Sequence, residues 1–163
     1  MTIKYSPKVG EIVFCDYGVF KTMQNGSFDN KNINGRIPPE MVKNRLVVVL
    51  NGRINNACVV VPLSSSLDQD KVSKRWHVPI SANLIAGMTH FTPKDRWAKC
   101  DHVQQVSKDR LFPLPAAQYL PFNVVADIQS GVMRVIGGAA LLAPPATSLT
   151  PPASASPAPL TQI

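Results

Sequence analysis

Two short runs of β-branched residues, separated by a polar link, constrain the fold of this chain most. Residues 46–50 read LVVVL and residues 58–63 read CVVVPL, so both runs are continuously apolar. Such runs are typical of strands that are buried on both faces. The dipeptide Asn51-Gly52 follows the first run and is a strong turn signal, so we expect the two runs to pair as a hairpin. Pro62 has no amide proton to donate and is expected near a strand end or a bulge.

Further strand candidates follow the same logic. They are residues 11–17, 76–80 and 97–101, the last of which either continues or turns into residues 103–106. Short strands that are separated by loops, with little helix between them, predict a mainly-β fold, namely a small barrel.

One helix is expected near the end of the folded region. Apolar residues recur at helical spacing from Asn123 to Ile136, and Gly137-Gly138 then supplies a C-terminal cap. Three stretches show neither pattern, and the longest is residues 18–44, followed by residues 67–75 and 93–96. Loops longer than ~15 residues in a small domain are usually functional or disordered. We therefore expect residues 18–44 to flank a binding groove.

The charge is distributed unevenly along the chain. The last charged side chain is Arg134, and residues 144–163 consist almost entirely of Pro, Ala, Ser, Thr and Leu. Such a segment buries too little apolar surface to offset its ordering entropy, so we expect one domain over residues 1–143 and a disordered tail over residues 144–163. The formal net charge of +7 favours a polyanionic partner, although a basic surface also serves solubility.

Several classes of protein are disfavoured. Residues 1–8 lack the apolar run of a signal peptide, and no stretch approaches the ~20 apolar residues of a membrane helix. The three cysteines are an odd number without a framework spacing. We therefore expect a cytoplasmic protein without a membrane partner. The chain has no Cys-x-x-Cys or His-x-x-x-His spacing for zinc, so we expect no metal, and we expect no cofactor. It has no Gly-x-Ser-x-Gly elbow, which disfavours a Ser–His–Asp hydrolase.

Four blocks of sequence carry a resemblance to a known family. They are GEIV at residues 10–13, RLVVVL at 45–50, VVPLSS at 60–65 and KCDH at 99–102. Their order and strand context resemble the MazF/PemK toxins of type II toxin–antitoxin systems. The resemblance implies an SH3-like barrel that forms a homodimer, cleaves single-stranded RNA without a metal, and is inhibited by a cognate antitoxin. One departure is that the family's arginine is usually followed by proline, whereas Leu46 follows Arg45 here.

The resemblance also implies a set of site residues. Arg45 matches the family's catalytic arginine, and a guanidinium suits two phosphate oxygens at once, although a solvent-facing arginine before a strand is the simpler reading. Ser64 matches a catalytic threonine or serine, with Ser65 as a close substitute. The alternative for Ser64 is a serine-rich turn that satisfies its own backbone.

Two carboxylates are candidates for the base that takes the 2′-hydroxyl proton. Asp101 matches a catalytic aspartate in one branch of the family, and Lys99 matches a catalytic arginine two residues earlier; strand geometry would put both on one face. The plainer reading is an exposed ion pair between them, worth ~0–1 kcal/mol. Glu40 is the other candidate base, or else begins a helix after Pro38-Pro39. On the same strand logic His102 would point away from Asp101.

RNA contacts are expected from loops and from aromatic side chains. The cations expected at the ends of the groove are Arg36, Lys43, Lys94 and Arg96. Trp97, Phe28 or Tyr17 could stack on an unpaired base, although core packing is the favoured role of Trp97.

Two other functions remain open on sequence alone. A CcdB-like toxin uses the same barrel to bind a protein such as DNA gyrase without catalysis, and an inactive relative could serve as an antitoxin-binding decoy. The CcdB-like proteins lack the groove arginine and aspartate, so Arg45 and Asp101 favour the ribonuclease.

Overall fold

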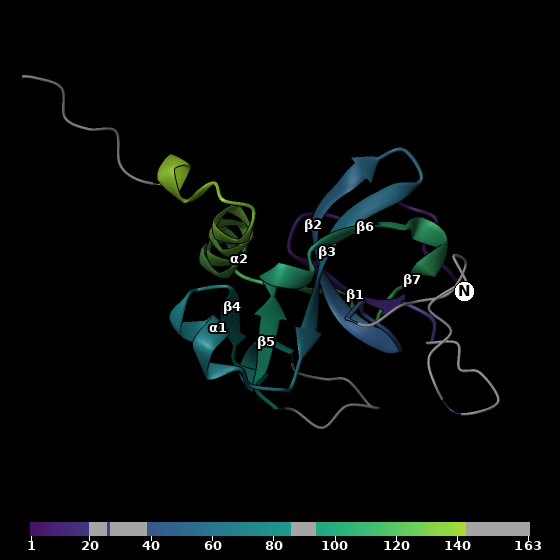
Figure 1. The fold of residues 1–163 in the computed structure, drawn as a ribbon. Helices are drawn as coiled ribbons and strands as arrows, with labels where there is room; N and C mark the ends of the chain where they lie inside the picture. Colours follow the sequence, from purple (N-terminus) through teal and green to yellow (C-terminus); the bar gives the residue numbers. More distant parts are fainter. Residues whose placement is uncertain (20–25, 27–38, 86–93, 143–163) are drawn as a thin grey trace, which may run out of the picture.

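The computed structural model describes residues 1–19, 26, 39–85 and 94–142. In this part of the chain a bent antiparallel sheet carries one long helix on one face (Figure 1). The strands are β1 (Glu11–Asp16), β2 (Asn44–Ile54), β3 (Ala57–Ser64), β4 (His77–Ile80), β5 (Arg96–Lys99), β6 (Gln104–Ser107), β7 (Leu111–Phe112) and β8 (Gln118–Tyr119). The helices are α1 (Gln69–Ser73) and α2 (Phe122–Val135), with short 3₁₀ turns η1 (Ala82–Ile85), η2 (Cys100–His102), η3 (Lys108–Arg110) and η4 (Ala139–Leu142).

The sheet bends because β3 changes partners along its length. The hydrogen-bonded order is β4-β5-β3-β2-β1-β7, and β6 and β8 pair with β3 and β1. Residues 57–60 of β3 pair with β6, whereas residues 63–64 pair with β5. Pro62 lies between these two segments, near the strand end as expected. The mainly-β class with a C-terminal helix is confirmed, but within the described residues the ladder runs from β4 to β7 without closing, so the barrel is an open one.

The central hairpin is confirmed, but its turn lies elsewhere than the sequence suggested. Ile54 pairs with Ala57, so Asn55 and Asn56 form the turn, and Asn55 has a positive φ of 32°. Asn51 and Gly52 belong to β2, where the register with β3 shifts. A Cβ at Gly52 would lie 2.0 Å from the carbonyl oxygen of Pro7, so glycine is required by a close approach of the N-terminal segment.

Alternation along the strands divides the core into two clusters. One face of β2 and β3 presents Leu46, Val48, Val61 and Leu63, which pack with Val125 and Ile128 of α2 and with β4 and β5. The other face gathers the side chains between β1, β2, β3, β6 and β7; these are Ile3, Val13, Cys15, Tyr17, Val47, Val49, Cys58, Val60, Val106 and Leu111. Burial on both faces accounts for the continuous apolar runs in the sequence.

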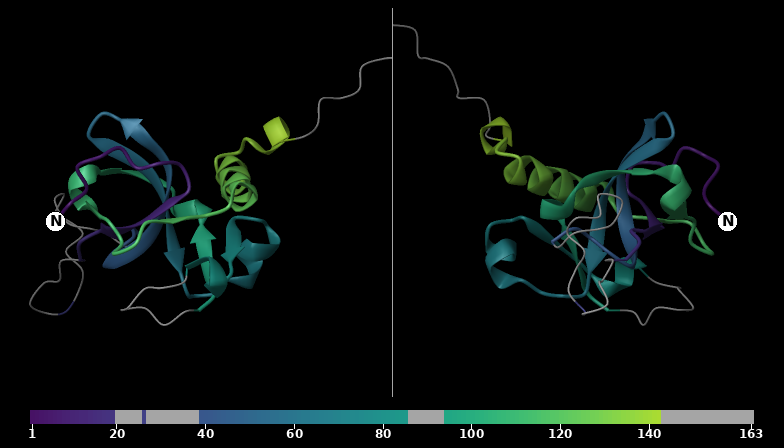
Figure 2. Two further views of the ribbon diagram at one scale, coloured as in Figure 1. Left: turned by 180° about the vertical axis from the view of Figure 1, so that it is seen from behind. Right: turned by 45° about the vertical axis from the view of Figure 1, so that its right-hand side comes forward.

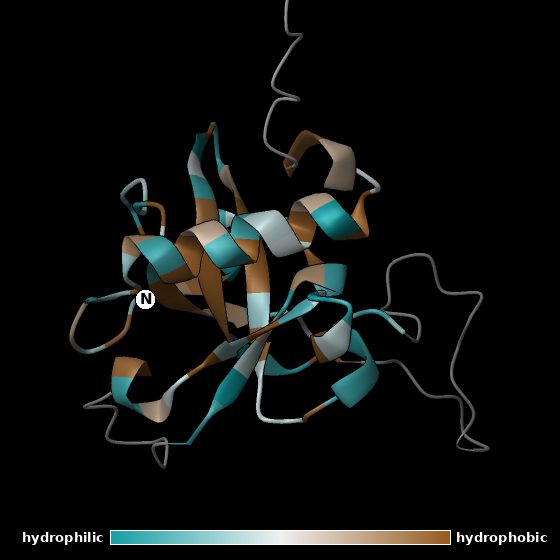
Figure 3. Cartoon of the chain, turned by 90° about the vertical axis from the view of Figure 1, so that its left-hand side faces the viewer, coloured by the Kyte–Doolittle hydropathy of each residue, from teal (hydrophilic) through white to brown (hydrophobic). Residues whose placement is uncertain are grey.

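The helix α2 packs through the stripe that the sequence predicts. Val125, Ile128 and Gly131 are its buried residues, and Figure 3 shows it lying across apolar strand segments of the sheet. Gly137 ends the helix with a φ of +83°, and the amide of Gly138 donates to the carbonyl of Met133 at 2.7 Å, which confirms the glycine cap. None of the helices in the described ranges has both the length and the apolar character needed to span a bilayer.

The sequence does not predict the helix α1 or the two short strands β7 and β8. α1 has only five residues and falls in the stretch 67–75 that was read as irregular. The carboxylate of Asp68 caps it by accepting from the amide of Lys71 at 3.2 Å. Figure 2 shows α1 beside β4, on the side of the molecule where α2 ends. Most of the predicted 18–44 loop and the predicted tail at 144–163 lie outside the described residues.

Candidate functional site

One face of the sheet brings together polar side chains that the sequence marks as site candidates. The register between β2 and β3 pairs Val47 with Pro62, which therefore present their side chains on the same face. Arg45 lies two residues before Val47 and Ser64 two residues after Pro62, so alternation directs both side chains to that face. Ser64 in turn pairs with Trp97 of β5.

Lys99 belongs to the same face. It lies two residues after Trp97 on β5 and pairs with His77 of β4. Because strand side chains alternate, Lys99 and His77 share the face of Ser64. The intervening Ala98 and the following Cys100 point the other way, into the cluster that α2 covers. The polar residues thus occupy the face opposite the long helix.

Arg45 is a half-buried residue near the start of β2. Its Nε donates to the carbonyl oxygen of Val42 at 3.2 Å. This hydrogen bond fixes one edge of the guanidinium and uses one of its five protons, so the terminal nitrogens keep their capacity to bind phosphate oxygens. The arginine is therefore part of the strand rather than a surface residue before it.

Ser64 makes the turn contact that the sequence offered as the alternative to a catalytic role. It is the last residue of β3 and is 9% exposed. Its Oγ accepts from the amide of Ser66 at 3.1 Å, which is the backbone-satisfying turn. Because the hydroxyl acts there as an acceptor, its own proton is still available for donation to an anion. Ser65 is exposed, one residue beyond the strand.

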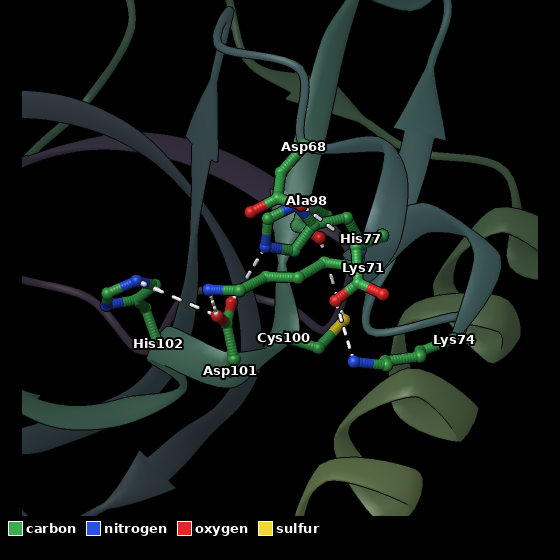
Figure 4. A network of polar contacts seen from close by, with 9 residues as sticks. Asp68, Lys71, Lys74, His77, Ala98, Cys100, Asp101 and His102 are labelled. Carbon is green, nitrogen blue, oxygen red and sulfur yellow. Dashed lines mark hydrogen bonds and ion pairs between the residues drawn. The ribbon is translucent and has the colours of Figure 1, made fainter.

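Asp101 is the centre of a polar network (Figure 4). Its Oδ2 accepts from Nζ of Lys71 at 2.5 Å, and its Oδ1 contacts Nε2 of His77 at 2.9 Å. His102 lies next to it, with Nε2 3.9 Å from Oδ2. Asp101 lies in η2 rather than on a strand, so the strand geometry that would put it on one face with Lys99 does not apply. Its ion-pair partner is Lys71 rather than Lys99.

The network fixes the charge of each member. Burial alone would raise the pKa of Asp101, but the hydrogen bond from Lys71 and the nearby His102 and His77 outweigh it and hold that pKa below its ordinary value. The hydrogen bond to Asp101 raises the pKa of Lys71. Burial lowers the pKa of His77, whose side chain is fully buried. The ion pair is therefore charged at neutral pH, and His77 is neutral, with the proton on the Nε2 that faces the carboxylate.

A small hollow lies beside this network. It measures about 170 Å³ and is lined by Glu40, Met41, His102, Val103 and Gln104. Glu40 is exposed, and residues 39–43 form a turn and a bend with no helical residue, so the helix-start interpretation is wrong. His102 was expected to point away from Asp101; that prediction is wrong, because both residues stand in the same 3₁₀ turn.

The predicted RNA contacts have mixed outcomes. Lys43 is exposed with a φ of 68°, and its amide donates to Gly18 at 2.7 Å across the base of the 18–44 loop. The prediction that Arg96 lies in a loop is wrong, because Arg96 is the first residue of β5 and is 7% exposed. Tyr17 is completely buried and unavailable for stacking, whereas Trp97 is half-buried. Lys94 is exposed before β5, and Arg36 and Phe28 lie outside the described residues.

Two members of the network were missed by the sequence analysis. Lys71 is 30 positions before Asp101, and His77 is 24 positions before it. The signal that was present is local: Asp68 is a preferred N-cap residue and Asp70 is an acidic residue two positions later, a pattern that predicts a helix start and would have placed Lys71 on a helix. Nothing in the spacing indicates that this helix faces η2.

Comparisons with known proteins agree with this fold. Residues 8–136 match the family described as "PemK-like, MazF-like toxin of type II toxin-antitoxin system". The chain is similar to "Putative uncharacterized protein YifN" of Escherichia coli K12, with 51% identity over 87% of this chain and 99% of the relative. It is also similar to an uncharacterized protein of Haemophilus influenzae, with 38% identity over the same shares of the two chains.

A solved structure supports the fold independently. The crystal structure of MazF from Deinococcus radiodurans superposes with a TM-score of 0.51 and 16% identity, covering 82% of this chain and 99% of that chain. At this identity the likeness concerns the fold alone. The match over residues 8–136 shows that the chain belongs to the PemK-like, MazF-like toxin family of type II toxin–antitoxin systems.

Proposed function

We propose that this protein is the toxin of a type II toxin–antitoxin system and acts as an endoribonuclease on single-stranded RNA. The observation that carries the proposal is the charged network around Asp101, in a chain of the toxin family whose Arg45 and Ser64 face the side of the sheet opposite α2. Cations, a hydroxyl and a carboxylate on one face form a set suited to binding and cleaving a phosphodiester.

The reaction needs no metal in this proposal. The 2′-hydroxyl attacks the adjacent phosphorus, its proton passes to a base, and the 5′-oxygen leaves, which yields a 2′,3′-cyclic phosphate. Arg45 binds the non-bridging oxygens, where negative charge grows in the transition state, and Ser64 donates a hydrogen bond to the same group. Lys99, Lys71, Lys43 and Ser65 supply further contacts to the phosphate backbone, together with Arg36 from the 18–44 loop. Asp101 and Glu40 are the two carboxylates that the resemblance offers for the proton-transfer step.

The partners follow from the family and from the charge. The family description implies a cognate antitoxin, and a chain of net charge +7 attracts an acidic antitoxin segment as it attracts RNA. A homodimer in the cytoplasm completes the proposal. Residues 1–143 would form the toxin domain, and residues 144–163 a tail without a part in catalysis.

A cleavage assay in the presence of EDTA tests the proposal. The purified protein should cut labelled single-stranded RNA into discrete fragments, and Arg45→Ala should remove the activity while the melting temperature changes little. Arg53→Ala is the matched control, because Arg53 is an exposed arginine of the same strand. Intact RNA with the wild-type protein, together with growth arrest on expression, would instead favour a toxin of the gyrase-binding kind. Cleavage that depends on added metal would overturn the proposed mechanism.

A further inference from the structure

We propose that His102 is the catalytic base that takes the 2′-hydroxyl proton, and that Asp101 is a positioning residue for it. The inference rests on the proposed ribonuclease function and assigns its proton-transfer step. It starts from the hollow of about 170 Å³ beside η2, which His102 lines together with Glu40 and Met41. His102 is the one imidazole of the network that combines partial exposure, 24% of its side chain, with a place on that hollow.

Asp101 is badly placed to act as the base. Both of its oxygens are engaged, Oδ1 with Nε2 of His77 at 2.9 Å and Oδ2 with Nζ of Lys71 at 2.5 Å. A carboxylate that is stabilised in its charged form by two donors is a weak proton acceptor. Its side chain is also only 13% exposed. These contacts suit a residue that holds its neighbours in place.

His77 is excluded by its burial. Its side chain has no exposed area, and its Nε2 proton is directed at Asp101. A substrate hydroxyl cannot reach that ring without rearrangement of β4 and β5. His77, which is fully buried, and His102, which is partly exposed, approach the carboxylate of Asp101 from different sides (Figure 4).

The geometry around His102 prepares it to accept a proton. Its Nε2 lies 3.9 Å from Oδ2 of Asp101, and the negative charge there favours a proton on Nε2. The lone pair then stands on Nδ1, which points away from the carboxylate in Figure 4. The carboxylate therefore acts on His102 through its charge rather than through a hydrogen bond, and Nδ1 is the nitrogen left to accept a proton.

The step balances without a co-reactant. The 2′-hydroxyl proton moves to Nδ1 of His102 while the O2′–P bond forms. The P–O5′ bond then breaks, its electron pair stays on O5′, and O5′ takes a proton from water. The imidazolium returns its proton to solvent, so the histidine ends the cycle neutral.

The charges around His102 determine its pH dependence. Burial lowers its pKa, Asp101 opposes this effect, and the cations Lys71 and Lys99 reinforce it. The groups that face His102 are Asp101 from its own turn, Lys71 from α1, Lys99 from β5, His77 from β4 and Glu40 across the hollow. The base must be neutral, so the rate should fall on the acid side, below the ordinary histidine value of about 6.5.

The test is the pH–rate profile of RNA cleavage in EDTA for wild type and two variants. His102→Gln keeps a side-chain amide near Nε2 but cannot accept the proton. We expect kcat/KM to fall by about 10²-fold or more and the acid limb to disappear, at an unchanged melting temperature. In Asp101→Asn the limb should persist and move to lower pH, since the neighbouring negative charge is gone.

The outcomes separate the two proposals. Gln105→Ala, an exposed substitution on the neighbouring β6, serves as the control and should cleave like wild type. A His102→Gln protein that retains both the rate and the acid limb overturns the assignment while leaving the ribonuclease intact. Loss of the acid limb in Asp101→Asn would return the base to Asp101. A wild-type protein that leaves RNA uncut overturns the ribonuclease itself, and this inference with it.

Discussion

The packing of α2 against the turn that carries Asp101 makes a sharp prediction for Gly131. This glycine is in the middle of α2, where glycine is intrinsically unfavourable, and it is buried. A Cβ built there would lie 2.7 Å from Sγ of Cys100 and 3.1 Å from the carbonyl oxygen of Arg75. Cys100 is the first residue of η2 and directly precedes Asp101. Gly131→Ala therefore pushes on the turn that carries the network.

Two opposing effects determine the sign of the change in stability. Helix propensity favours alanine over glycine by about 1 kcal/mol. Overpacking a close contact costs about 1–3 kcal/mol, and the sulfur at 2.7 Å has buried neighbours that resist its movement. We expect a net loss of about 1 kcal/mol in the free energy of unfolding, or roughly 2–4 °C in melting temperature.

A double-mutant cycle identifies the cause. Cys100→Ala removes the sulfur, so the double variant should recover about 1 kcal/mol relative to the sum of the single changes. Denaturant unfolding of the four proteins measures this coupling. Gln129→Ala, at an exposed position of α2, is the control and should change stability by less than about 0.5 kcal/mol. A Gly131→Ala protein that is more stable than wild type would refute the close-packing argument.

Three further predictions follow from the network and the hairpin. Lys71→Gln should lower RNA cleavage about tenfold or more, because it removes the cation that pairs with Asp101, whereas Lys74→Gln, at the exposed C-terminal cap of α1, should leave it unchanged. The free energy of unfolding should fall as pH drops below about 6.5, because the pKa of His77 is lower in the folded state, so the unfolded chain binds more protons; the lowered pKa of Asp101 adds a loss below about 3.9. Thermal melts across pH check this, and His77→Gln should flatten the upper part of the slope. Gly52→Ala should lower the melting temperature by several degrees, through a loss of about 1–3 kcal/mol, because its Cβ would overlap a backbone carbonyl.

The sequence predicted those parts of the fold that depend on local patterning. The two apolar runs, the helix stripe and its glycine cap each follow from side-chain periodicity and backbone preference, and the structure confirms them. The prediction of a turn at Asn51-Gly52 was wrong. Glycine is used in tight turns and also where two backbones approach closely, and the sequence alone does not separate these two uses. Helix α1 was missed because five residues are too few for a helical period to emerge.

The site was harder to predict because its contacts are long-range. Arg45 and Ser64 could be proposed from the resemblance, and the hairpin register then directs both side chains to one face of the sheet. The pairing of Asp101 with Lys71 joins the short helix α1 to the 3₁₀ turn η2, and no periodicity connects the two. The orientation of His102 was predicted wrongly because alternation was assumed through a segment that the structure resolves into a 3₁₀ turn.

The central claim is that the RNA supplies its own nucleophile, and one substitution in the substrate tests it. The sites of cleavage are first mapped on an RNA oligonucleotide in EDTA. The same oligonucleotide is then made with a single 2′-deoxy nucleotide on the 5′ side of the scissile bond. The account predicts that this bond stays intact while cleavage elsewhere in the same molecule continues. Cleavage of the deoxy-substituted bond at the wild-type rate would contradict it.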